Sequence, residues 1–161
     1  MTDADVQARI RELSGTAEQH GYHLNPDTET VQALARGLMV NENRYGYPSC
    51  PCRLASGRRG EDLDIICPCD YRDTDLAEFG TCYCALYVTR PVAEGREPVR
   101  PIPDRRPPPA QRRSGPASIP AGTFPSPVFR CPVCGYLCAR GAPPEVCPIC
   151  GVSGDRFLRF V

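Results

Sequence analysis

Three cysteine pairs in the first part of the chain have the composition and spacing of a metal or redox site. Each pair has the form Cys-x-Cys, and the six thiols are Cys50, Cys52, Cys67, Cys69, Cys82 and Cys84. Cys-x-Cys is a poor motif for tetrahedral zinc, which usually takes four ligands from two Cys-x-x-Cys motifs. A [4Fe-4S] cluster takes one protein ligand on each iron, so four thiols saturate one cluster and two remain. The two spare thiols indicate a redox-active pair beside a one-electron cofactor.

Four cysteines near the C-terminus form a second candidate metal site. They lie in two Cys-x-x-Cys-Gly motifs, made of Cys131, Cys134 and Gly135 and of Cys147, Cys150 and Gly151. The glycine permits a backbone turn that brings N–H groups toward the sulfurs. Four thiolates in tetrahedral geometry suit one iron or one zinc ion. The eleventh cysteine, Cys138, is interpreted as a small buried residue or an incidental thiol.

Composition limits the classes of protein that this sequence can encode. The chain has 161 residues, 11 cysteines and a formal net charge of zero, which argues against a nucleic-acid-binding surface over the whole chain. Its apolar runs are too short for a transmembrane helix, so no membrane partner is expected. The acidic start lacks the features of a secretory signal, which predicts a cytoplasmic protein with reduced thiols.

Helices are predicted on both sides of the first cysteine pair. Apolar residues at helical spacing form two stripes, one with Val6, Ile10 and Leu13 and one with Val31, Leu34, Leu38 and Met39. Asn25 is predicted as the N-cap of the second helix, with Pro26 at its first position. A third, short helix is predicted over residues 73–79.

Proline divides the chain into three parts. Residues 91–127 hold 11 of the 19 prolines and no cysteine, so this stretch favours extended polyproline conformation and cannot bury a core. It is predicted to be a linker between a domain at residues 1–90 and a domain at residues 128–161.

The first domain resembles the catalytic subunit of ferredoxin–thioredoxin reductase. The matching motifs are Asn25-Pro26-Asp27, Tyr45 to Arg53, Asp64 to Cys69, and Gly80 to Val88. The resemblance covers more than half of the chain and includes all six Cys-x-Cys thiols in order. The resemblance implies a mainly α-helical domain around a [4Fe-4S] cluster, and an oxidoreductase. It would pass single electrons from a ferredoxin-type donor to a disulfide of thioredoxin or a related protein.

The same resemblance implies a role for each thiol. Its cluster ligands would be Cys50, Cys67, Cys69 and Cys82. Cys52 and Cys84 would form the active disulfide, with Cys52 attacking the target and Cys84 held against the cluster. One electron would cleave that disulfide with Cys84 bonding to the cluster, and a second would release Cys84. Tyr83 stands where the plant-type enzyme has a histidine, and tyrosine is a poor proton donor at neutral pH.

The last domain resembles the short rubredoxin-like domain at the end of rubrerythrins. The resemblance rests on Phe129 to Tyr136, Ala142 to Gly151 and Phe157. It implies a small β-rich unit with one mononuclear iron on Cys131, Cys134, Cys147 and Cys150, and zinc as the alternative. Two other functions remain open for the chain: a non-catalytic zinc-binding interaction module, and a simple electron-transfer protein.

Overall fold

Side-chain caps determine where the first two helices begin in the computed structural model. Helix α1, Asp3–Gln19, follows Thr2, whose hydroxyl accepts a hydrogen bond from the backbone N–H of Asp5. The Asp5 carboxylate accepts one in return from the Thr2 backbone, which completes a capping box. Helix α2, Thr28–Tyr45, follows Asp27, whose carboxylate accepts from N–H groups of the first turn.

The predicted N-cap at Asn25 is wrong by two residues. Asp27 caps α2 instead, and the Asn25 side chain donates to the carbonyl oxygen of Ala85, 2.9 Å away. Asn25 also accepts from the backbone N–H of Asp27 at 2.9 Å. The Asn25 oxygen, which would accept in a helix cap, instead accepts within a local turn from Asp27, while its NH2 group holds a distant carbonyl.

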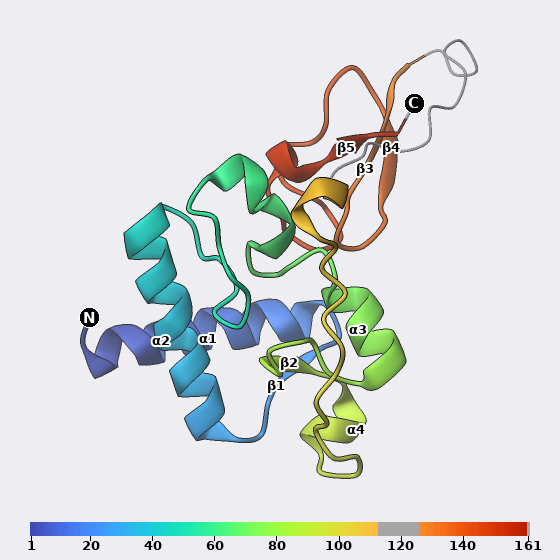
Figure 1. The fold of residues 1–161 in the computed structure, drawn as a ribbon. Coiled ribbons are helices and arrows are strands. Elements are labelled where there is room, and N and C mark those ends of the chain that lie inside the picture. The colour runs from blue at the N-terminus through green and yellow to red at the C-terminus, as the bar shows by residue number, and fades with distance from the viewer. Residues whose placement is uncertain (113–125, 161) are drawn as a thin grey trace. The chain divides into compact units, whose positions relative to one another are not determined.

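Helices α1 and α2 cross each other and share one core with the third cysteine pair (Figure 1). Both predicted apolar stripes contribute to the packing: Val31, Leu34 and Leu38 are buried in this core, and Ile10 and Leu13 pack against it. The other buried members are Ala17, Leu76, Cys82, Leu86 and Tyr87. Cys82 thus belongs to the same core as the long helices.

A short two-stranded sheet joins the beginning of this part to its end. Strand β1, His23–Leu24, pairs antiparallel with strand β2, Tyr87–Val88. Between them lie α2, two 3-10 turns at Arg59–Glu61 and Leu63–Ile65, and helix α3, Arg72–Phe79. Helix α4, Arg90–Ala93, follows. The short helix predicted at 73–79 is confirmed, and this part of the chain is mainly helical, as predicted.

The C-terminal part is a three-stranded antiparallel sheet beside a cluster of thiols. Its strands are β3, Val128–Arg130, β4, Leu137–Ala139, and β5, Leu158–Arg159, in the order β4-β3-β5. Buried side chains between the sheet and the loops are Cys131, Val133, Cys147, Cys150, Val152 and Phe157. The prediction of a small β-rich unit is confirmed.

The structure describes residues 1–112 and 126–160. It divides into two units, Met1–Asp104 and Arg105–Val161, which are described separately below. Part of the proline-rich stretch predicted as a linker, residues 113–125, lies outside the described residues, and the boundaries 1–90, 91–127 and 128–161 remain a prediction. None of the described helices is long and apolar enough to cross a membrane.

Candidate redox site and metal centre

Backbone hydrogen bonds place the first cysteine pair beside the second. Helix α2 ends at Gly46, whose positive φ of 81° turns the chain toward Cys50. The N–H of Cys50 donates to the carbonyl of Ile65 at 2.7 Å, and the N–H of Cys67 donates to the carbonyl of Pro48 at 2.9 Å. The two segments therefore run side by side where they carry their thiols.

The third pair sits in a tight turn that leads into β2. The N–H of Cys82 donates to the carbonyl of Tyr87, and the N–H of Ala85 donates to the carbonyl of Cys82 at 2.8 Å. Ala85 has φ of +58°, which is unusual for a residue with a side chain. The Asn25 amide holds the Ala85 carbonyl, so Asn25 fixes the shape of the turn that presents Cys84.

The six thiols gather at one place but differ in their exposure. Cys50, Cys69 and Cys82 are buried, Cys67 and Cys84 are half-buried, and Cys52 is exposed. Cys84 lies among the other thiols: its sulfur is 3.7 Å from that of Cys82, and interactions with the thiols of Cys50 and Cys52 help to raise its pKa. The exposed thiol of Cys52 is thus close enough to the Cys84 thiol to interact with it.

Hydrogen-bond donors point at the buried sulfurs. Arg53 Nη1 lies 3.4 Å from the Cys69 sulfur, and the backbone N–H of Tyr87 lies 3.3 Å from the Cys82 sulfur. Burial raises the pKa of Cys67, and it raises the pKa of Cys69 to about 12. The N–H donors suit thiolates, and cations bound at the sulfurs would offset the cost of burying that charge.

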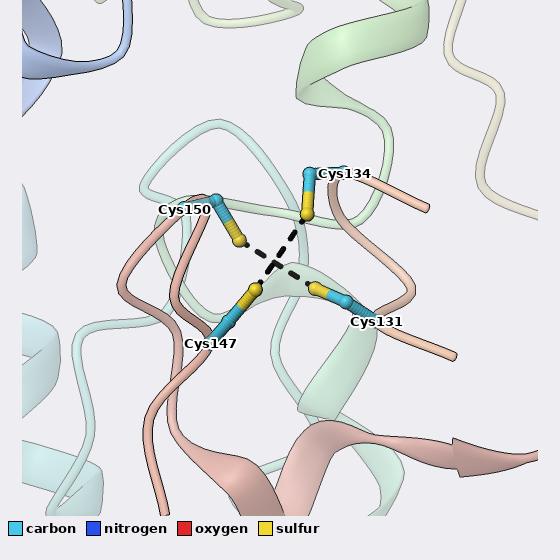
Figure 2. A group of neighbouring side chains, drawn as sticks. All are labelled: Cys131, Cys134, Cys147 and Cys150. Carbon is cyan, nitrogen blue, oxygen red and sulfur yellow. Dashed lines mark hydrogen bonds between the residues drawn. The ribbon is translucent and has the colours of Figure 1, made fainter. Parts of the chain in front are cut away.

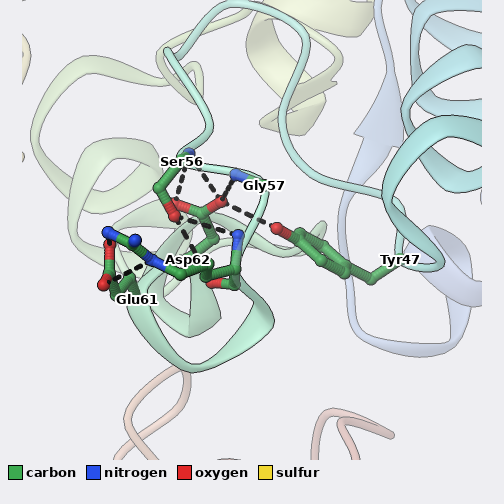
Figure 3. Close-up of polar contacts among 6 residues, drawn as sticks. Tyr47, Ser56, Gly57, Glu61 and Asp62 are labelled. Carbon is green, nitrogen blue, oxygen red and sulfur yellow. Dashed lines mark hydrogen bonds and ion pairs between the residues drawn. The ribbon is translucent and has the colours of Figure 1, made fainter.

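A buried carboxylate shapes the loop between the first and second pairs (Figure 3). Asp62 accepts from the backbone N–H groups of Ser56 and Gly57 at 2.7 and 3.1 Å, and from the hydroxyl of Tyr47 at 2.8 Å. Burial and this hydrogen bond raise the pKa of Tyr47 to about 12, so the phenol remains a donor at physiological pH. Asp62 thereby ties the loop to the segment that leads into Cys50.

Helix α2 supports the first pair through a glycine. A Cβ atom added at Gly37 would lie 2.8 Å from Cβ and 2.9 Å from Cγ of Pro51, the residue between Cys50 and Cys52. Such distances are shorter than carbon atoms tolerate, and a proline ring has little freedom to turn aside. The absence of a side chain at Gly37 allows the first pair to lie against the helix.

We expect Gly37→Ala to destabilise the N-terminal unit by about 1–3 kcal/mol through overpacking against Pro51, despite the gain in helix propensity. Gly15→Ala is the matched control, because a Cβ at Gly15 in α1 has nothing within 4 Å. That control should stabilise the protein by about 0.5–1 kcal/mol. Urea unfolding followed by the helical circular dichroism signal measures both. Equal stabilisation by the two substitutions would show that the contact with Pro51 has no cost.

The C-terminal unit brings its four predicted ligands to one point (Figure 2). The sulfur atoms of Cys131, Cys134, Cys147 and Cys150 all lie within 4.8 Å of one another. Sulfur–sulfur distances are 3.5 Å between Cys131 and Cys150 and 3.6 Å between Cys134 and Cys147. This arrangement fits one metal ion held by four thiolates.

Two equivalent turns build this centre. Gly135 and Gly151 have φ of 78° and 71°, and each donates its N–H to the carbonyl of the first cysteine of its motif, at 3.0 and 2.9 Å. Cys138 pairs with Phe129 in the register of β4 and β3 and packs against the cluster core, but its sulfur is not one of the four that converge. The two turns account for the glycine that follows each Cys-x-x-Cys motif.

A family model described as the ferredoxin thioredoxin reductase catalytic beta chain matches residues 1–102. The chain belongs to this family. A second model, the rubredoxin-like domain of rubrerythrin, matches residues 129–158. The ferredoxin thioredoxin reductase family consists of oxidoreductases, and the predicted combination with a rubredoxin-like domain is confirmed.

Curated relatives carry the same family name. The ferredoxin-thioredoxin reductase catalytic chain of Porphyra purpurea is 28% identical over 89 residues, which are 53% of this chain and 72% of the relative. That of Pyropia yezoensis is 29% identical over 83 residues, covering 50% and 68%. That of Guillardia theta is 30% identical over 66 residues, covering 40% and 61%.

Sequence reasoning missed several residues that position the thiols of this reductase-family chain. Local capping rules misplace Asn25, and no local pattern indicates a role for Gly37, Arg53 or Asp62. Their effects depend on contacts with residues far along the chain: Asn25 with Ala85, Gly37 with Pro51, and Arg53 with Cys69. In the sequence, the position of Arg53 directly after Cys52 indicates only that its side chain lies near the thiols.

Proposed function

We propose that the chain reduces a protein disulfide, on thioredoxin or a related protein, with single electrons from a ferredoxin-type donor. Cys52 and Cys84 would be the redox-active thiols, and Cys50, Cys67, Cys69 and Cys82 would hold a [4Fe-4S] cluster. The observation that carries the proposal is an exposed Cys52 that interacts with Cys84, whose sulfur lies 3.7 Å from the buried Cys82. Family membership supports the same reaction class.

The spacing of the buried thiols fits a cluster better than a single ion. Among the residues that the structure describes, the one group of ligand atoms close enough for a single ion is the C-terminal one. Sulfurs on different irons of a cluster lie further apart than ligands of one ion, because the irons themselves are separated. Arg53 Nη2 is also buried without a hydrogen-bond partner, and a sulfur of the cluster would supply an acceptor.

A bound cluster would supply electrons one at a time. The thiolate of Cys52 attacks one sulfur of the target disulfide, which forms a mixed disulfide and releases the other target sulfur as a thiolate. The thiolate of Cys84 then attacks the Cys52 sulfur, closes the Cys52–Cys84 disulfide and releases the second target thiolate. The target gains two electrons and takes two protons from solvent. Two electrons from the donor, delivered singly, reopen the Cys52–Cys84 disulfide.

For the C-terminal unit we propose a mononuclear iron on Cys131, Cys134, Cys147 and Cys150, with zinc as the alternative. The four converging sulfurs fit either metal in tetrahedral geometry. Iron is favoured because the same chain carries a redox site. The rubredoxin-like match supports a metal there without deciding which one.

Metal analysis of the anaerobically purified protein tests the proposal directly. We expect about five iron atoms and about four acid-labile sulfides per chain, with visible absorption from iron–thiolate bonds. The same preparation should reduce thioredoxin when a reduced ferredoxin is supplied. A colourless protein with about two zinc ions and no sulfide would instead support the alternative function, a non-catalytic zinc-binding interaction module. Iron and sulfide without any disulfide reduction would support a simple electron carrier.

A further inference from the structure

Arg53 follows the exposed thiol in sequence, but its side chain serves a different cysteine. Nη1 lies 3.4 Å from the sulfur of Cys69, and Nε lies 2.9 Å from a carboxylate oxygen of Asp104. The Arg53 side chain is 1% exposed and that of Asp104 is 38% exposed. An arginine keeps its charge under all physiological conditions, so a permanent positive charge is buried beside one of the proposed cluster ligands.

Two tyrosine rings pack on this guanidinium. Its central carbon lies 4.4 Å from the ring centroid of Tyr83 and 4.9 Å from that of Tyr71. The Tyr71 hydroxyl donates to Asp64 at 2.8 Å, which holds that ring in place. Tyr83 lies between Cys82 and Cys84, so Arg53 links all three pairs: it follows the first, bonds to the second and stacks on the third.

We infer that Arg53 is a positioning residue that acts through Cys69 to favour reduction of the bound metal group, and that Tyr83 holds it there. This inference rests on the proposed function. One-electron reduction removes an electron from the donor and adds one negative charge to the metal group. A fixed cation nearby stabilises that added charge, and burial strengthens the interaction because little water screens it.

Asp104 opposes this effect. Its carboxylate offsets part of the Arg53 charge, and its partial exposure means that solvent screens it more than it screens the buried guanidinium. Arg53 and Asp104 therefore have opposite effects on the same electron. Removing either charge would therefore shift the reduction potential in opposite directions if the role is electrostatic. If the Arg53–Asp104 pair only stabilised the fold, removing either residue would lower stability in the same way.

In this arrangement Tyr83 has a role that needs no proton transfer. The ring contributes its face to the guanidinium, so the hydroxyl is dispensable for stacking. Tyr83→Phe should keep an aromatic ring stacked on the Arg53 guanidinium, and Tyr83→Leu should lose this stacking. This pair of variants separates stacking from proton donation.

The test is the one-electron midpoint potential of the metal group in the full-length protein, measured by electrochemical titration with electron paramagnetic resonance. This method distinguishes cluster signals from those of a mononuclear ferric iron. At the wild-type midpoint, Arg53→Gln should lower the ratio of reduced to oxidised cluster at least about tenfold, a shift of about 59 mV. Tyr83→Leu should shift the potential in the same direction, and Tyr83→Phe should leave it unchanged. Asp104→Asn should shift it upward.

Three outcomes overturn the inference while the proposed function stands: equal potentials in wild type and Arg53→Gln, a downward shift in Asp104→Asn, or equal shifts in Tyr83→Phe and Tyr83→Leu. If Arg53→Gln fails to load iron, Asp104→Asn and the two Tyr83 variants decide the question. A wild-type protein without cluster iron would defeat the proposed function itself, and iron and sulfide analysis before the titration identifies that case.

Discussion

Replacing Cys52 by serine should lower the rate of disulfide reduction by more than about a thousandfold. A serine hydroxyl is not ionised at neutral pH and forms no disulfide, so the attack on the target is lost. The iron and sulfide contents should stay at the wild-type level, because Cys52 is the exposed thiol and is not among the proposed cluster ligands. Donor-driven reduction of thioredoxin, followed by labelling of its new thiols, measures the loss.

Cys84→Ser should fail at a later step and leave a product that can be isolated. Cys52 still attacks the target, but no partner thiol resolves the mixed disulfide. We expect a covalent complex between the Cys84→Ser variant and the target, seen by mass spectrometry and dissolved by a small thiol. Cys52→Ser should form no such complex. A complex found only in Cys52→Ser would show that Cys84 attacks the target and Cys52 resolves the mixed disulfide. A complex in neither variant would show that these two cysteines are not the redox-active pair.

Replacing Cys147 by serine should remove the metal from the C-terminal unit and unfold that unit. Its strands are two to three residues long, and cysteines make up half of its buried core cluster, Cys131, Cys147 and Cys150. A four-cysteine metal site contributes on the order of 10 kcal/mol to the folding of so small a unit. The measurements are metal content, which should fall by about one ion per chain, and protease cleavage within residues 128–160.

Cys138→Ser is the matched control for this substitution. Cys138 lies in the same small sheet and is half-buried, but its sulfur lies outside the four-sulfur group. It should retain the metal and the protease resistance of the wild type. Loss of metal in Cys138→Ser, or retention in Cys147→Ser, would show that a different set of sulfurs holds the metal.

Local patterns predicted much of this fold. The apolar stripes of α1 and α2 have helical spacing, and the two Cys-x-x-Cys-Gly motifs lead to turns whose glycines have positive φ. These features depend on residues within a few positions of one another, so a single sequence contains the information. The order and spacing of the six paired thiols likewise led to the family that the comparison confirms.

Local patterns do not reveal the residues that position the candidate redox site, because each depends on a contact between distant segments. The Asn25 amide bonds to Ala85, and Asp104 bonds to Arg53 from a stretch whose prolines predicted a linker. At Asn25 the amide oxygen accepts from the N–H of Asp27 and the NH2 group donates to Ala85, so Asp27 caps the helix instead. No local pattern distinguishes these two outcomes.

The pairing of β1 with β2 bears on how the protein is made. Strand β2 follows all six paired thiols along the chain, and the sheet that closes the N-terminal unit needs both strands. Contacts between such distant segments form late, after the intervening chain is available. Every paired thiol therefore leaves the ribosome before the site can close around a metal. Until β2 has been made and pairs with β1, these thiols are open to solvent and therefore to oxidation.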